Sequence, residues 1–156
     1  MVYGALVALF QRLGGGVLQG VPIADIGNAI LYGVNIAAGV MITVIAHVAL
    51  VIISWMMARA VGGPGGLIGI YRSTAYLLPI AIPTLPWLAL NGAGSLQQAQ
   101  AIPFAQVFGP LAFAGLSLVM IGLFQIFLVV QQVSPLRAAI GTVLTSVFIT
   151  SILMIL

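Results

Sequence analysis

Hydrophobic residues run along this chain in long unbroken stretches, separated by short segments rich in glycine, proline and glutamine. Unbroken apolar stretches of about 20 residues have the length that a membrane-spanning helix requires. The strands of a transmembrane barrel would instead alternate apolar and polar residues. The pattern therefore predicts an all-α, polytopic transmembrane helix bundle that forms a single membrane domain. We expect about five spans, at residues 1–21, 34–60, 74–90, 106–131 and 136–156.

The segments between the first stretches carry signals of their own. Three consecutive glycines, Gly14 to Gly16, indicate a connection after the first stretch. Asp25, the only acidic residue of the chain, is expected to cap a short interfacial helix over residues 26–32. The glycine-rich turn at 62–66 ends the second stretch, and residues 67–73 predict a short helix near the lipid head groups.

The third stretch contains three prolines, Pro79, Pro83 and Pro86. Each proline removes a backbone donor and clashes with the preceding turn, so we expect an irregular or kinked helix. In lipid, the carbonyls that lose their partners must be satisfied by neighbouring helices or water, so this segment is expected to pack inside the protein. Residues 91–103 predict a loop with a short interfacial helix, and residues 131–135 predict a tight turn.

Composition strengthens the membrane interpretation. The chain is 63% hydrophobic and only 3% charged, with a mean hydropathy of +1.32, whereas about a quarter of the residues of a soluble domain are charged. The bilayer must therefore be its solvent. There is no lysine and no cluster of basic residues in the sequence, which excludes nucleic acid as a partner. There is also no cysteine, which excludes thiolate metal sites.

The arginines predict an orientation. Arg59 and Arg72 flank the connection between the second and third spans, and Arg137 lies between the fourth and fifth. With five spans these connections share one side, and the other side holds Arg12 and Asp25. Because arginine is enriched in cytoplasmic loops, we expect the N-terminus to be cytoplasmic, in a bacterial inner membrane.

His47 is the strongest candidate for chemistry because it lies near the middle of the second span. Ionisable residues at membrane depth are functional candidates by default. A neutral imidazole can ligate the metal of a haem or chlorophyll, or relay a proton. The alternative is a neutral histidine that is hydrogen-bonded across to another helix, for example to a serine or threonine of the last span. No thiolate or second histidine accompanies it, so it cannot belong to a metal site built from several protein ligands.

The sequence predicts a protein that is not an enzyme and requires no cofactor. Acid–base catalysis needs a positioned pair of titratable groups, and Asp25 and His47 are far apart in the sequence. Neither a Gly-x-Ser-x-Gly nor a His-Glu-x-x-His motif is present. The 62–66 turn lacks the Gly-Lys-Ser/Thr of a phosphate-binding loop, and it follows a membrane helix rather than a strand.

The stretch around this turn also carries a family resemblance. The run Arg-Ala-Val-Gly-Gly-Pro-Gly-Gly begins at Arg59, and Ala75-Tyr76-Leu77-Leu78-Pro79 follows. With the Arg137-Ala138 pair that opens the final span, these residues resemble the Yip1-domain family of integral membrane proteins, in its bacterial type. The resemblance covers roughly residues 34–156. It implies a five-helix bundle with a cytoplasmic N-terminus, and it implies a fold rather than a reaction.

Together these features predict a small structural or accessory subunit that packs against partner integral membrane proteins in the lipid bilayer. The residues expected to contact lipid or partners are Arg59, Arg72, Tyr76 and Arg137. Two alternatives remain. The first is a transporter or channel component that uses polar faces of the third and fifth spans, the fifth being lined by Thr142, Thr145, Ser146, Thr150 and Ser151. The second is a subunit that contacts a pigment or haem through His47.

Overall fold

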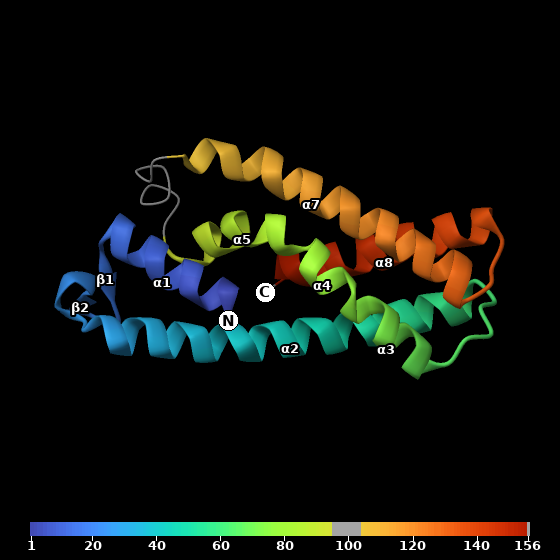
Figure 1. Ribbon diagram of the computed structural model, residues 1–156, viewed down its shortest axis with the longest axis horizontal. Helices are drawn as coiled ribbons and strands as arrows, with labels where there is room; N and C mark the ends of the chain where they lie inside the picture. The colour runs from blue at the N-terminus through green and yellow to red at the C-terminus, as the bar shows by residue number, and fades with distance from the viewer. Residues whose placement is uncertain (95–103, 156) are drawn as a thin grey trace. The chain divides into compact units, whose positions relative to one another are not determined.

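The computed structural model describes residues 1–94 and 104–155, with the backbone alone at 150 and 152–155. The described chain is predominantly helical, as Figure 1 shows, and the prediction of an all-α protein is confirmed. It divides into two compact units. Unit 1 comprises Met1–Val44 and Ile82–Gly115, and unit 2 comprises Ile45–Ala81 and Leu116–Leu156.

Unit 1 begins with a short helix and a tight hairpin. Its elements, in chain order, are α1 (Val2–Gly14), β1 (Val17–Leu18), β2 (Val21–Pro22), the 3₁₀ turn η1 (Ile23–Asp25), the first part of α2 (Asn28–Ala60), the 3₁₀ turn η2 (Ile82–Thr84), α5 (Leu85–Gly92) and the first part of α7 (Ala105–Gln125). The helix α1 ends where Gly15 adopts a φ of +64°, which favours glycine. Val17 then pairs with Pro22 in an antiparallel register.

Unit 1 is held by contacts between α1 and its neighbours. Its buried side chains include Val7 and Phe10 of α1 and Leu90 of α5. The Phe10 ring also lies 5.6 Å from the Phe108 ring of α7, measured between centroids. On the other side, α1 approaches α2 so closely that a Cβ on Gly39 would lie 2.7 Å from the Gly4 nitrogen.

Unit 2 has its own buried core. Its elements are the second part of α2, then α3 (Leu67–Ala75), α4 (Leu77–Ile80), the second part of α7, the π-helical segment η3 (Ile126–Val130) and α8 (Pro135–Ile155). Phe127 is fully buried at the centre of this core, among Val51, Ile70 and Ala138. The helix α8 packs tightly against it, since a Cβ on Gly141 would lie 3.1 Å from the Phe127 ring.

The helices that could cross a membrane are fewer than the five predicted. In the described chain, Asn28–Ala60 and Ala105–Val130 are long and apolar enough, and a third span exists only if the broken pair Leu67–Ile80 and Ile82–Gly92 counts as one. The first predicted span ends early because Gly14 to Gly16 stop α1 after 13 residues. The prolines interrupt the third span, as expected. The Pro135–Ile149 part of α8 is a shorter apolar helix. A bundle of five spans is therefore not supported.

The second span begins earlier than predicted. The interfacial helix expected at residues 26–32 is not separate, because α2 runs without a break from Asn28 to Ala60. Asp25 lies in η1 and is exposed. Gly33, the expected boundary, lies inside the helix, where a glycine costs only about 1 kcal/mol relative to alanine.

Candidate functional site

His47 in α2 faces α3 and forms a hydrogen bond with it. Its Nε2 lies 3.2 Å from the hydroxyl oxygen of Thr74, which is fully buried. The same hydroxyl donates to the carbonyl of Ile70 at 2.9 Å. A threonine hydroxyl has one proton, so it accepts from His47 whenever it donates to Ile70. The tautomer of His47 with its proton on Nε2 is the one that satisfies both bonds.

The aromatic ring of Tyr71 covers the imidazole of His47. The two ring centroids are 5.2 Å apart, and Tyr71 is 52% exposed. His47 is hydrogen-bonded to a threonine of another helix, as the packing alternative predicted, but that threonine is Thr74 of α3 rather than a residue of the last span. This bond joins α2 to α3 within unit 2. Within the described residues, no group of three or more His, Cys, Asp or Glu could hold a metal ion.

The same face of α2 carries further polar groups toward the core of unit 2. His47, Val51 and Ser54 are spaced four and three residues apart, which places them on one side of a helix. The Ser54 hydroxyl is buried and has no hydrogen-bond partner. The indole N–H of Trp55 is also buried and without a partner. Unit 2 therefore holds donors that its own atoms do not satisfy.

The glycine-rich turn is built around a buried amide. Gln131 is fully buried, and its Oε1 accepts a hydrogen bond of 3.0 Å from the Gly65 N–H. A Cβ on Gly63 would lie 2.7 Å from that oxygen, and a Cβ on Gly65 would lie 2.5 Å from Nε2 of Gln131. The turn needs glycine because the backbone passes directly over the amide. The sequence marks Gln131 only as the start of a turn and gives no signal that its amide is buried. Among the described residues, Nε2 of this amide has no partner.

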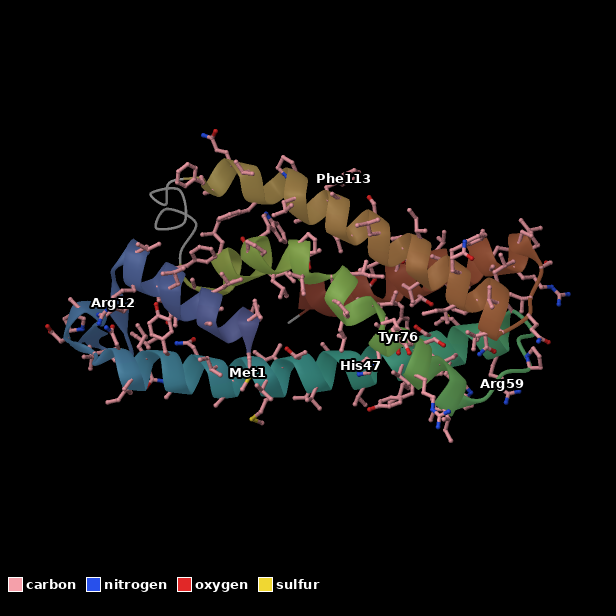
Figure 2. All side chains as sticks on the ribbon, in the orientation of Figure 1. Met1, Arg12, His47, Arg59, Tyr76 and Phe113 are labelled. Carbon is pink, nitrogen blue, oxygen red and sulfur yellow. The ribbon has the colours of Figure 1, made fainter. Side chains whose placement is uncertain are left out.

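Two of the predicted contact residues flank this turn. The guanidinium carbon of Arg59 lies 5.8 Å from the centre of the Trp55 ring, a cation–π contact at the C-terminal end of α2 (Figure 2). Nη1 of Arg137 would lie 3.2 Å from a Cβ on Gly62, so this side chain covers the turn. Both arginines are exposed. The structure thus brings Arg59 and Arg137 to one end of unit 2.

The other two predicted contact residues lie on or beside α3. Arg72 is exposed in its last turn. Tyr76, which follows the helix directly, is 75% exposed. Among the described interactions, none joins Arg72 or Tyr76 to the glycine-rich turn. The structure thus gives Arg59 and Arg137, but not these two residues, a described contact at the turn.

In unit 1 an arginine is used in a different way. The guanidinium of Arg12 donates to the carbonyl of Ile23 at 2.5 Å and to the carbonyl of Ile26 at 3.1 Å. Its Nε and Nη2 both donate to the side-chain oxygen of Asn28. These bonds fasten the end of α1 to the segment that opens α2. Arg12 was expected only to mark one side of the membrane.

A second polar contact joins α1 to α2 in unit 1. The Asn35 amide donates to Oε1 of Gln11 at 3.0 Å and to the carbonyl of Leu31 at 2.9 Å. Gln11 is buried, with 8% of its surface exposed. Hydrogen bonds between amide side chains are a common contact between packed membrane helices. This pair lies on the same helix face as the close approach of Gly4 and Gly39.

The hydroxyl groups of α8 bond to their own helix. Thr142 donates to the carbonyl of Ala138 at 2.9 Å, and Thr145 donates to Gly141 at 2.8 Å. The hydroxyls of Ser146 and Ser151 also lie within hydrogen-bond distance of the carbonyls four residues earlier, and Ser146 additionally reaches Sδ of Met120 in α7 at 2.6 Å. The side chain of Thr150 lies outside the described residues. Satisfied hydroxyls of this kind are typical of packing rather than of a path for solutes.

Comparison with known proteins adds no assignment. No protein-family model matches the chain, and searches of curated proteins and of solved structures give no significant match. The resemblance to the Yip1-domain family therefore stays a prediction, carried by the residues around Arg59 and Tyr76. The function must be argued from the geometry of the chain itself.

Proposed function

We propose that this protein is a non-enzymatic integral membrane protein that serves as a structural or accessory subunit and packs against partner membrane proteins. One observation carries the proposal. In the most apolar windows of Asn28–Ala60 and Ala105–Val130, only 17% and 22% of the residues are buried inside the chain. Both helices therefore offer most of their apolar surface to lipid or to other proteins.

The distribution of polar groups supports the same conclusion. Thr74, Thr145 and Gln131 are fully buried, whereas Ile45 of α2 and Ile121 of α7 are 63% and 58% exposed. A water-soluble protein would reverse this arrangement, because exposed apolar surface is unfavourable in water. The described hydroxyls of α8 donate to their own helix, so the geometry favours a structural subunit over a transport path.

The proposal includes an orientation, with the 62–66 turn on the cytoplasmic side of a bacterial inner membrane. Arg59 and Arg137 flank this turn, and arginine is enriched on the cytoplasmic side. This orientation of the turn does not depend on the number of spans. A cytoplasmic N-terminus would also require α1 to cross. Its 13 residues measure about 20 Å, which is less than the hydrocarbon core of about 30 Å. We therefore propose an orientation for the turn and none for the N-terminus.

Labelling of single cysteines tests the orientation, and the chain has no native cysteine to interfere. A cysteine at the exposed Gln132, beside the turn, should react with a membrane-impermeant maleimide in inverted vesicles but not in intact spheroplasts. A cysteine at Leu18, in the exposed hairpin of unit 1, is the comparison site. Labelling of Gln132→Cys from the outside of intact cells would refute the orientation.

Photo-crosslinking in the native membrane tests the subunit role. A photoreactive amino acid at the exposed Met41 or Ile121 should form adducts with other proteins. The same amino acid at the buried Phe127 should crosslink only within the chain and serves as the matched control. Native mass spectrometry in a mild detergent should then detect a complex. Lipid adducts alone, together with a lone monomer that co-purifies with nothing, would refute the role.

A further inference from the structure

We propose that the Gly62–Gly66 turn, together with Arg59 and Arg137, binds the phosphate group of an anionic phospholipid. This inference rests on the proposed function only in requiring that this end of unit 2 lies at a membrane surface. The proposed site is local, because it involves only two of the four arginines of the chain. General attraction between a basic protein and an anionic membrane would instead involve all of them.

The sequence of unit 2 offers no acidic side chain to the charges around the turn. Unit 2 contains three arginines in its sequence and neither aspartate nor glutamate. The single acidic residue of the sequence, Asp25, belongs to unit 1. No acidic side chain of unit 2 therefore competes with an external anion for Arg59 and Arg137. At a membrane surface, the negative groups at hand are lipid phosphates.

Each of the two guanidinium groups lies beside the turn. The guanidinium carbon of Arg59 lies 5.8 Å from the centre of the Trp55 ring, and Nη1 of Arg137 would lie 3.2 Å from a Cβ on Gly62. A guanidinium has only donors, arranged as a planar fork that matches two oxygens of a phosphate. The contact of Arg59 with Trp55 lowers the conformational freedom that Arg59 loses on binding.

The hydrogen bonds of the turn leave few backbone donors for a ligand. The N–H groups of Gly63 and Gly62 donate to the Ala58 and Arg59 carbonyls at 2.7 and 3.0 Å, and the Gly65 N–H donates to Oε1 of Gln131. Among the described residues, the Gly66 N–H at the start of α3 has no partner. The two guanidinium groups and this N–H are therefore the donors that a phosphate would engage.

Apolar residues beside the turn select a lipid rather than free phosphate. Leu67 and Ile68, which follow the turn directly, are 44% and 68% exposed. Leu136, next to Arg137, is 72% exposed. Acyl chains would cover these side chains while the phosphate engages the arginines. Free phosphate would leave them in water, which is unfavourable for apolar surface.

Lipid titration of the full-length protein tests the site. The protein, purified in a neutral detergent, is titrated with dioctanoyl-phosphatidylglycerol or with dioctanoyl-phosphatidylcholine, and native mass spectrometry counts the bound lipids. We expect phosphatidylglycerol to bind more tightly. Arg59→Gln and Arg137→Gln should each weaken it by about tenfold or more, because each removes charge-assisted hydrogen bonds.

Arg72→Gln is the matched control, since it removes the same charge from the same unit but from the last turn of α3, where no described contact joins it to the turn. It should change the affinity less than about twofold. Arg137→Lys should fall between wild type and Arg137→Gln, because lysine keeps the charge but not the planar fork. Circular dichroism and the unfolding temperature confirm that each variant remains folded.

Several outcomes would overturn the site. Equal losses in the three glutamine variants would indicate diffuse attraction, and equal binding of phosphatidylcholine would exclude selection of an anion. Competition by inorganic phosphate at the concentration of the lipid would refute the lipid assignment. None of these results bears on the crosslinks at Met41 and Ile121. Failure of the lipid site and failure of the subunit role are therefore distinguishable.

Discussion

Unit 1 and unit 2 use arginine in opposite ways. In unit 1, Arg12 turns inward and donates to the carbonyls of Ile23 and Ile26 and to Asn28. In unit 2, Arg59 and Arg137 stay exposed beside a turn, and the buried polar groups are uncharged. A count of charges alone therefore does not distinguish arginines that hold the fold together from arginines that are available to bind another molecule. What separates them is whether backbone carbonyls already accept from the guanidinium.

The largest expected effect concerns the close contact of α1 with α2 in unit 1. Gly39→Ala places a Cβ 2.7 Å from the Gly4 nitrogen, which is backbone and cannot move aside easily. We expect a loss of stability of about 3 kcal/mol, measured by thermal unfolding in detergent. Gly33→Ala in the same helix meets nothing within 4 Å and should stabilise by about 0.5–1 kcal/mol. Equal effects of the two variants would show that the contact is not tight.

The next effect tests the contrast between the arginines directly. Arg12→Gln removes donors from the carbonyls of Ile23 and Ile26 and should cost about 2 kcal/mol of stability. The amides of residues 23–28 should exchange hydrogen faster. Arg59→Gln, the counterpart in unit 2, should change stability by no more than about 0.5 kcal/mol. The comparison of the two units fails if Arg59→Gln destabilises the protein as much as Arg12→Gln.

A smaller effect is expected at the buried amide of unit 2. Gln131→Leu leaves the Gly65 N–H without its acceptor but also removes an unpaired donor. The two terms partly offset, so we expect a net loss of about 1 kcal/mol by chemical denaturation. Gln125→Leu, at an exposed position near the end of α7, is the control and should be neutral. A fully neutral Gln131→Leu would mean that the turn holds its shape without the amide.

The smallest effect concerns His47 and Thr74. A double-mutant cycle with His47→Leu and Thr74→Val should give a coupling energy of about 0.6 kcal/mol, the usual size for side-chain hydrogen bonds between membrane helices. Visible absorbance spectra of the purified complex should be the same for wild type and His47→Leu. An absorbance band that is lost in His47→Leu would revive the pigment or haem hypothesis.

Local signals in the sequence predicted most of the helical elements. The short helix after the glycine turn is present as α3, and the three prolines interrupt the third stretch as expected. The all-α fold is confirmed, because helix formation and helix breaking depend on residues that lie close together in the sequence. The predicted number of spans is not supported, because the sequence shows where a break is but not how strong it is. Whether glycine ends a helix, as Gly14 to Gly16 do and Gly33 does not, depends on the conformation that each glycine adopts.

Contacts between distant segments could not be predicted in this way. Arg59 and Arg137 were candidates because charge is rare in this chain, but only the fold places both beside Gly62. Gln131 bonds to Gly65, which lies 66 residues away, and nothing local marks its amide as buried. The partner of His47 was sought in the last span, although a closer threonine lay in α3. In a chain with several serines and threonines, helix packing decides which one becomes the partner.

The π-helical segment η3 bears on how this chain can change length. Its hydrogen bond from the Gln131 N–H to the Ile126 carbonyl spans five residues rather than four, so one extra residue is accommodated within the turn. Deletion of one residue between 126 and 130 would turn this bond into an ordinary α-helical bond between the same two groups, so Gln131 would still point at Gly65. Deletion of one residue in the regular part of α7 would instead rotate the following residues by about 100° and turn Gln131 away from Gly65. The exposed hairpin at residues 17–22 has no such constraint, so insertions and deletions of any length should be tolerated there, whereas near Gln131 the wide turn can lose only its one extra residue.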